Sequence, residues 1–204
     1  MNAQAKLKNH KAYLGDLIGG SLMLRESQTI AELLLTLPSA DDWHDAIVNR
    51  NVLQKRSDAS AKRNAATIKK RLVGLSDVYL EKLAFGGTEL ATQLMFAATL
   101  INSPMLADFM RNVVINAKRV FREYLDQKDW ESFWDDSVRI YPELGSMSET
   151  STYKIAQVAF KLLADAGYID STRTKKLQNI FLLPEVRSLL AQMERDDVIA
   201  AMEV

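Results

Sequence analysis

Apolar residues recur at helical spacing along almost the whole chain, and this periodicity constrains the fold more than any other feature. Alternation at every second position, which is typical of half-buried strands, is nearly absent. Only eight glycines and four prolines interrupt the 204 residues. The sequence therefore predicts an all-α protein.

Composition narrows the class of protein further. Apolar residues make up 48% of the chain, which is enough for one large or two small hydrophobic cores. The absence of cysteine excludes disulfides, thiolate metal sites and cysteine nucleophiles, and it suits a reducing compartment. Residues 1–11 are polar and carry lysines, without the apolar core of a signal peptide. We therefore expect a cytoplasmic location.

The first third of the chain, residues 1–75, predicts a helix-turn-helix-like lobe. We expect helices over residues 13–24, which include Gly19-Gly20, and over residues 29–37, ended by Pro38. Asp41 or Asp42 is suited to cap the next helix, which carries Trp43. A basic helix follows, with Ser57, Asp58 and Ser60 available as caps. Three short-linked helices of which the third is basic have the layout of a helix-turn-helix unit.

The basic helix stands out because the net charge of the chain is zero. The stretch Arg50–Arg71 holds eight Lys or Arg residues and a single acid, Asp58. Its apolar residues form one stripe, and its cations lie on the opposite side with small residues between them. Such a helix suits the major groove of duplex DNA, although a solvated basic face without a ligand is an equally compatible interpretation. The stripe comprises Ala61, Ala65, Ile68, Leu72 and Leu75.

Residues 76–128 predict a central apolar helical bundle, with helices over 77–83, 89–101 and 105–125. Leu90–Ala107 contains no charge and approaches the length of a membrane span, but polar residues and Pro104 interrupt it. We therefore interpret it as buried core and expect no membrane partner. An acidic stretch follows around Trp130, Phe133 and Trp134. It indicates either a protein-binding surface or, as we favour, core aromatics with solvated acids.

The last segment, residues 129–204, predicts a winged-helix-like lobe. A helix over residues 152–166 ends before Gly167, a residue suited to the position after a helix C-cap. Tyr168-Ile169 and Leu177–Leu183 then flank a basic turn as two strands, although Leu177–Leu183 equally suits a helix. A closing helix follows Pro184. The predicted architecture is thus helix-turn-helix or winged-helix-like lobes at both ends, packed on the central bundle.

The sequence contains no recognisable catalytic motif. His10 and His44 lie outside any metal-binding spacing, and the glycine pairs lack the frames of phosphate-binding loops. The adjacent acids Asp135-Asp136 point to different sides of a helix and do not face each other. We therefore expect a non-enzymatic protein without a cofactor or a metal ion.

Taken together, these features resemble the BrxA family of bacteriophage exclusion (BREX) defence systems. The similarity covers about Tyr13–Leu190, and its most distinctive run is Ser151–Tyr168. The resemblance implies a cytoplasmic, non-enzymatic accessory protein that binds double-stranded DNA beside a DNA methyltransferase, an ATPase and other BREX components. Earlier residues that carry it are Gly19, Gly20, Leu22, Glu26, Trp43, Asn51–Gln54, Ser57, Lys62, Arg63, Arg71, Leu72, Gln93–Ala98, Asp108, Phe109, Val113, Val114, Trp130 and Phe133; Pro184 and Val186 follow the run.

We therefore predict binding to duplex DNA, mainly through phosphates and with weak sequence preference. About six neutralised phosphates predict a slope near −5 for log affinity against log salt. A protein-interaction scaffold and an RNA-binding helical protein remain the alternatives. The predicted main contacts are Arg50, Lys55, Arg56, Lys62, Arg63, Lys69, Lys70 and Arg71. A second contact is predicted at Tyr153, Lys154, Gln157 and Lys161 of the later helix and at Arg173, Lys175 and Lys176 of the basic turn.

Overall fold

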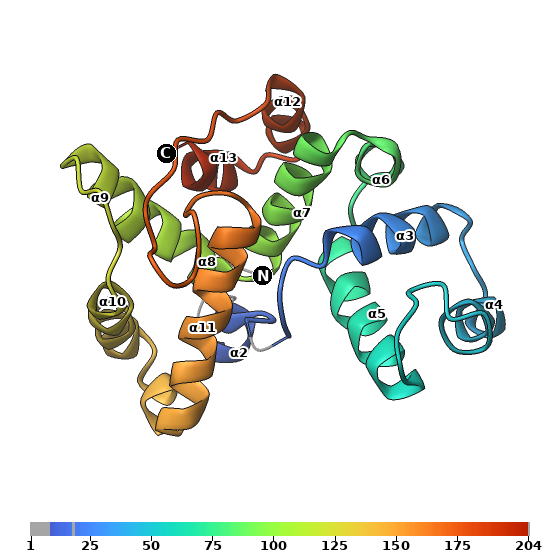
Figure 1. Cartoon of the computed structure of the whole chain (residues 1–204), viewed down its shortest axis with the longest axis horizontal. Coiled ribbons are helices and arrows are strands. Elements are labelled where there is room, and N and C mark those ends of the chain that lie inside the picture. The colour runs from blue at the N-terminus through green and yellow to red at the C-terminus, as the bar shows by residue number, and fades with distance from the viewer. Residues whose placement is uncertain (1–8, 18, 204) are drawn as a thin grey trace. The chain divides into compact units, whose positions relative to one another are not determined.

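The computed structural model describes residues 9–17 and 19–203, and every regular element within them is a helix, which confirms the predicted all-α class (Figure 1). Contacts divide the chain into two compact units. The 22–99 unit is Leu22–Thr99, and the split unit combines Met1–Ser21 with Leu100–Val204. The predicted boundary between residues 75 and 76 therefore falls inside the 22–99 unit.

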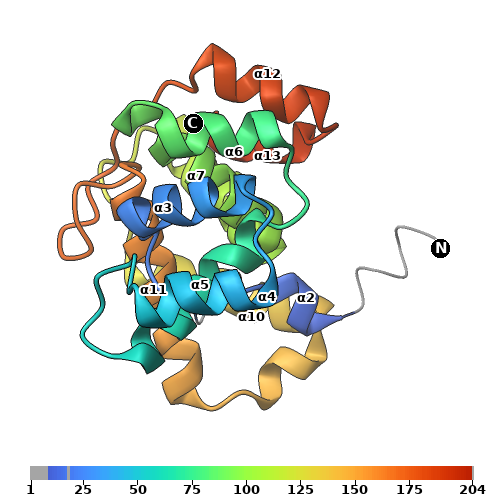
Figure 2. The same ribbon diagram turned by 90° about the vertical axis from the view of Figure 1, so that its right-hand side faces the viewer.

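The 22–99 unit is built around α3, which packs on α5 and on α6 (Figure 2). The π-helical segment η1 continues α4 and packs on α5. The helices of this unit are α3 (Leu24–Leu35), α4 (Ala40–His44), η1 (Asp45–Asn49), α5 (Asp58–Leu72), α6 (Asp77–Phe85) and most of α7 (Thr88–Asn102). Ile30, Ile68 and Leu83 are fully buried where these helices meet.

Helix α5 forms where the sequence predicts the basic helix. The Ser57 hydroxyl accepts a hydrogen bond from the Ser60 backbone N–H, which caps the helix start. Four members of the predicted stripe are buried on α5, and Leu75 is half-buried beyond its end. The predicted cap of α4 is wrong. Ser39 caps that helix, because its hydroxyl and the Asp42 carboxylate satisfy each other's backbone N–H groups in a capping box.

The split unit encloses an aromatic core. The Phe109 ring lies 4.9 Å from Trp130, 5.2 Å from Phe133 and 6.0 Å from Phe160, measured between ring centroids. The interpretation of the aromatics in the acidic stretch as core is therefore confirmed. The helices of this unit are α2 (His10–Leu14), α8 (Pro104–Phe109), η2 (Met110–Val114), α9 (Ile115–Arg119), α10 (Gln127–Ile140), η3 (Pro142–Ser146), α11 (Glu149–Asp165), α12 (Pro184–Gln192) and α13 (Asp196–Met202).

The first predicted helix, over residues 13–24, is wrong. Helix α2 ends at Leu14, and Gly15 adopts a positive φ of 62°. A Cβ atom there would lie 2.0 Å from the backbone oxygen of Asn102, so this close approach requires glycine. The expectation that the chain begins without a signal peptide rests partly on residues 1–8, which lie outside the described residues.

The apolar middle of the chain is buried, as predicted. Side chains from Leu94 to Ala98 are fully buried. No single helix in the described ranges is long and apolar enough to span a membrane; α7 and Pro104–Arg119 pass that test of length and composition only as a bent pair. The predicted helix over 105–125 ends early, at Arg119; Phe121 then adopts a positive φ of 57°, and Leu125 donates its backbone N–H to the Lys175 carbonyl.

The two predicted wing strands are absent from the described part of the chain, which contains only isolated bridges in this region. Ile169 bridges Leu177, and Tyr124 bridges Lys176. The Gln178 N–H still bonds to the Tyr168 carbonyl, and residues 179–183 form neither strand nor helix. The closing helix is confirmed as α12.

Candidate nucleic-acid interface

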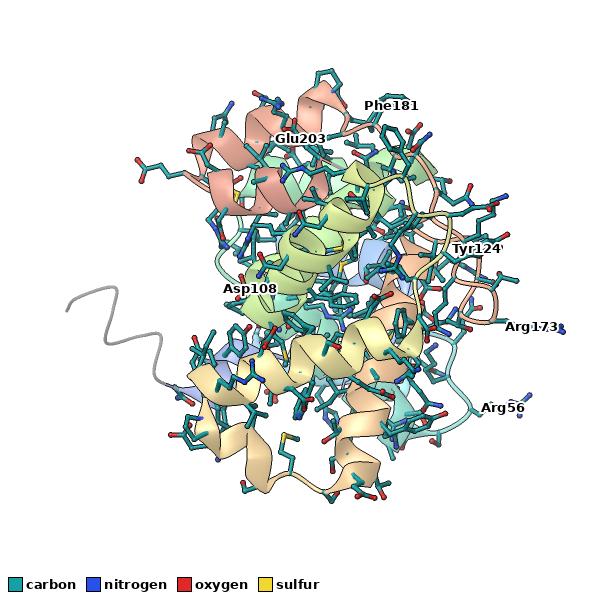
Figure 3. All side chains as sticks on the ribbon, turned by 90° about the vertical axis from the view of Figure 1, so that its left-hand side faces the viewer. Arg56, Asp108, Tyr124, Arg173, Phe181 and Glu203 are labelled. Carbon is teal, nitrogen blue, oxygen red and sulfur yellow. The ribbon has the colours of Figure 1, made fainter. Side chains whose placement is uncertain are left out.

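The exposed face of α5 carries cations that no other group holds. Lys62, Arg63 and Lys70 are exposed, and the small residue Ala66 lies between them. Arg56, in the preceding loop, is also exposed and points away from the ribbon (Figure 3). Within residues 9–17 and 19–203, no side-chain hydrogen bond or ion pair engages these four cations. We call them the free basic set.

The other four predicted contacts of this unit are held by the protein itself. Arg50 Nε lies 2.8 Å from an Asp45 carboxylate oxygen, and Lys55 forms an ion pair with Glu26. The Lys69 ammonium lies 4.2 Å from the ring centroid of Trp43, within the range of a cation–π contact. The remaining residue, Arg71, is only 2% exposed. Its burial removes it from any surface that a duplex can reach.

The two carboxylates that hold Arg50 and Lys55 remain ionised at neutral pH. Burial alone would raise the pKa of Glu26, but the hydrogen bond and charge of Lys55 outweigh it and lower that pKa. Hydrogen bonds from Asn49 and then from Arg50 lower the pKa of Asp45. Both cations are therefore neutralised locally near pH 7.

The predicted C-terminal contacts divide in the same way. Tyr153, Lys154 and Gln157 are exposed on α11, whereas Lys161 lies 2.6 Å from the Asp165 carboxylate. In the basic turn, the Lys175 ammonium lies 5.1 Å from the Phe160 ring centroid, and Lys176 lies 2.9 Å from the Glu123 carboxylate. Arg173 is exposed and extends outward (Figure 3). In the described residues, Lys154 and Arg173 are thus the predicted cations of this unit without a partner.

Asp170 orders the turn that presents Arg173. One carboxylate oxygen accepts backbone N–H bonds from Ser171 at 2.6 Å and Lys176 at 2.9 Å. Thr174 donates its hydroxyl to both oxygens, and this hydrogen bond is the main cause of the lowered pKa of Asp170. The turn therefore keeps a fixed shape, but a negative charge lies at its base.

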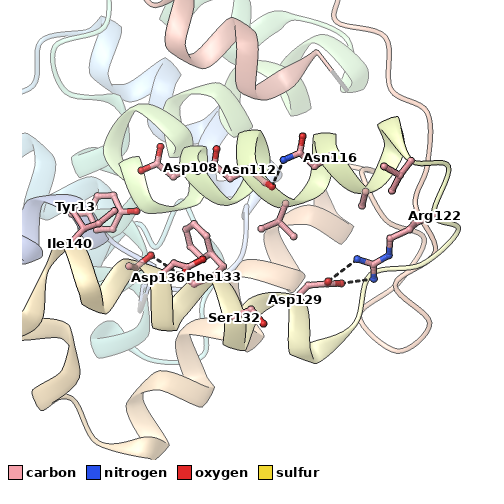
Figure 4. Close-up of a pocket in the computed structure, with 14 residues that line it drawn as sticks. Tyr13, Asp108, Asn112, Asn116, Arg122, Asp129, Ser132, Phe133, Asp136 and Ile140 are labelled. Atoms are coloured by element: carbon pink, nitrogen blue, oxygen red, sulfur yellow. Dashed lines mark hydrogen bonds and ion pairs between the residues drawn. The ribbon is translucent and has the colours of Figure 1, made fainter.

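One pocket of the split unit has a volume of about 520 Å³, and the acids Asp108, Asp129 and Asp136 line it (Figure 4). Arg122 holds Asp129 through two hydrogen bonds of 2.7 and 2.8 Å, and Arg139 lies 2.7 Å from Asp136. Burial, followed by the charge of Asp108, raises the pKa of Tyr13, so its hydroxyl stays protonated at neutral pH. Within the described ranges, no group of three His, Cys, Asp or Glu side chains could hold a metal ion.

Comparison with known proteins identifies the family. The family model described as BrxA matches residues 11–194. The chain belongs to the BrxA family. It is 42% identical to the BREX protein BrxA of Escherichia coli O9:H4 (strain HS), across 97% of this chain and 92% of the relative. The BREX protein BrxA of Paramagnetospirillum magneticum (strain ATCC 700264 / AMB-1) is 33% identical, across 94% and 96%.

A solved structure supports the fold of this BrxA-family chain. The crystal structure of an uncharacterized protein from Magnetospirillum magneticum matches it with a TM-score of 0.86 and 32% identity. The match covers 94% of this chain and 98% of the other. The family resemblance predicted from the sequence is therefore confirmed.

Sequence reasoning missed the residues that hold the predicted contacts in place. Asp165 lies four residues after Lys161, a helical spacing that was readable in advance. By contrast, Glu26 precedes Lys55 by 29 positions and Glu123 precedes Lys176 by 53, so no local pattern signals these pairs. Trp43 likewise meets Lys69 only through the packing of η1 on α5.

Proposed function

We propose that this chain binds double-stranded DNA as a non-enzymatic, cytoplasmic accessory component of a BREX phage-defence system. The observation that carries the proposal is the exposed face of α5, where cations without partners surround a small residue. The names of its relatives support a place in a BREX system. In this proposal the free basic set is the main contact, and other BREX components act beside the chain.

The order of the helices supports this mode of binding. The succession of α3, α4 with η1, and α5 has the layout of a helix-turn-helix unit, in which the third helix enters the major groove. Lys62 and Lys70 are eight residues apart, or about 12 Å along a helix, which corresponds to about three to four base-pair steps. Ala66 between them allows the backbone to approach the duplex closely.

The chemistry of the free basic set favours phosphates over base edges. The lysines are compact charges without the planar fork that reads guanine, so Lys62 and Lys70 contribute affinity and little discrimination. Arg63 is the member placed on α5 that has the geometry to read guanine. We therefore propose binding with weak sequence preference. In this proposal Arg173, in the ordered turn where the sequence predicted a wing, adds a weaker contact to the duplex together with Lys154.

A salt series on a fluorescent random-sequence duplex tests the proposal. If each member of the free basic set neutralises one phosphate, the slope of log affinity against log salt is about −3.6. The variant Arg56→Gln, Lys62→Gln, Arg63→Gln, Lys70→Gln should lose about a hundredfold in affinity at low salt and most of this slope. Glutamine keeps side-chain length and helix propensity, so the fold should persist, as circular dichroism would verify.

A matched control separates the α5 surface from net charge. The variant Lys11→Gln, Arg25→Gln, Arg119→Gln, Lys128→Gln removes the same charge from exposed positions elsewhere and should bind within about threefold of wild type. Equal losses in both variants would reject α5 as the interface. If duplex RNA or single-stranded DNA competes more strongly than duplex DNA, that nucleic acid is the ligand and the proposal of duplex DNA is wrong. If the wild type binds no nucleic acid even at low salt, nucleic-acid binding is excluded.

A further inference from the structure

A second pocket of the split unit lies between α10 and α11 and has a volume of about 380 Å³. Its apolar lining includes Trp130 and Trp134 of α10, Met147, and Tyr153 and Ala156 of α11. The volume falls within the range of about 300–1,000 Å³ that is typical of ligand sites. Tyr153 is 59% exposed, so an occupant can reach its ring from solvent.

Three carboxylates surround this apolar lining without a partner. Glu131, Asp135 and Glu149 line the pocket, and none of them forms an ion pair or a side-chain hydrogen bond within the described ranges. No Lys, Arg or His is among the described residues that line it. The other side of α10 differs, because Asp129 and Asp136 there are each held by an arginine. The pocket therefore presents uncompensated negative charge beside aromatic rings.

Trp130 lines this pocket although its side chain is almost fully buried. Its side chain is 1% exposed, yet its indole N–H has no hydrogen-bond acceptor among the described residues. It is the only described side chain with a buried nitrogen or oxygen atom in this condition. Such groups are rare in native proteins. The nitrogen atom is itself buried, so an occupant of the pocket contacts the ring of Trp130 and not this N–H.

We propose that this pocket binds an arginine or lysine side chain, together with its adjacent backbone, from a segment of a partner protein. Aromatic rings beside carboxylates favour a cation, through cation–π attraction to Trp134 and Tyr153 and ion pairing with the three acids. A peptide supplies the cation and apolar surface together, whereas the acids repel a nucleic acid.

This site reassigns one predicted DNA contact. Tyr153 lies on α11 but lines the acidic pocket, so it serves the protein partner and not the duplex. The inference does not depend on DNA binding by α5, because no residue of the free basic set lines the pocket. The two proposals therefore succeed or fail separately.

Indole resonances of the ¹⁵N-labelled full chain provide the test, since the protein has three tryptophans and gives three indole signals. The probe is the capped peptide Ala-Arg-Leu-Arg-Ala, and the control peptide carries neutral citrulline in place of arginine. We expect the peptide to move the Trp130 and Trp134 signals and to leave Trp43, which lies in the other unit, unchanged. An absent shift, or equal affinity for the citrulline peptide, would overturn the proposal.

Variants test the acids directly. Glu131→Gln, Asp135→Asn, Glu149→Gln should weaken peptide binding at least tenfold, whereas Glu81→Gln, Glu143→Gln, Glu194→Gln, with the same change in charge at exposed positions, should not. The first variant should still bind duplex DNA at least as tightly as wild type. Equal peptide affinity in both variants would reject the site. Concentration-dependent self-association that the pocket variant abolishes would assign the pocket to a second copy of the chain and overturn the partner segment.

Discussion

The two predicted basic surfaces are alike in sequence but differ in the charge that they can offer to a ligand. In the 22–99 unit, α5 and its preceding loop keep the free basic set exposed. In the split unit, Lys161 and Lys176 are each neutralised by a carboxylate, and Lys175 lies against an aromatic ring. A count of cations therefore overstates a binding surface wherever acids are placed within reach of them.

Ion pairing in the folded chain, and not sequence spacing, explains the difference. Asp58, the single acid of α5, precedes Lys62 by four residues, which is also the separation of Lys161 and Asp165, but Asp58 forms no ion pair with Lys62 in the described part of the chain. On α11, Asp165 lies one helical turn beyond Lys161.

Substitutions at the neighbouring positions Arg71 and Lys70 should have opposite effects: the first should lower stability, and the second should weaken DNA binding. Arg71→Gln removes a buried, engaged guanidinium and should destabilise the fold by about 3 kcal/mol, whereas the folded fraction binds DNA normally. Lys70→Gln should change stability by less than about 0.5 kcal/mol and weaken DNA binding several-fold. Urea unfolding and a binding titration measure both quantities. Direct loss of binding by folded Arg71→Gln would contradict this division.

Releasing the paired cations should make the split unit resemble α5. Glu123→Gln with Asp165→Asn frees Lys176 and Lys161, and should raise duplex affinity about threefold to tenfold with a steeper salt slope. Glu143→Gln with Glu194→Gln makes the same change in net charge at exposed positions and serves as the control. If both variants gain the same duplex affinity, the gain comes from net charge, and local pairing does not explain the difference between the two basic surfaces.

The smallest effect concerns the ion pair between Glu26 and Lys55. Because the folded state lowers the pKa of Glu26 below its ordinary value of 4.5, the pair's stabilisation is fully present above pH 4.5 and is lost as pH falls through the lowered pKa. We expect a contribution of at most about 1 kcal/mol. Urea unfolding of wild type and Glu26→Gln between pH 3 and 6 measures it. A difference that does not diminish at low pH would rule out this ion pair as its source.

Helices were predictable wherever a long apolar stripe coincided with clear end signals. Four members of the α5 stripe formed on that helix with Ser57, one of its three candidate caps, and the later predicted helix formed before Gly167, although α11 begins at Glu149. Predictions failed where a distant segment decided the backbone. The backbone of Asn102 leaves no room for a side chain at position 15, which therefore requires glycine. The backbone N–H of Leu125 bonds to the Lys175 carbonyl and not to a carbonyl of the predicted helix.

The candidate site was predictable in its residue types but not in their availability. Lys62, Arg63 and Lys70 share one exposed face because helical periodicity places them there. The roles of Arg50, Lys55 and Lys69 depend on Asp45, Glu26 and Trp43, which the folding of other helices brings to them.

An all-helical chain, a resemblance to the BrxA family and a basic face on α5 could be predicted without a structure. The helices and the basic face follow from local periodicity and residue types, and the resemblance rests on the order of particular residues along the chain. Three features depend on the folded chain: which cations remain free, the burial of Arg71, and the pocket between α10 and α11 where three unpaired acids lie beside aromatic rings. The physical reason is that pairing and burial depend on distances of a few ångströms between segments that can lie tens of residues apart.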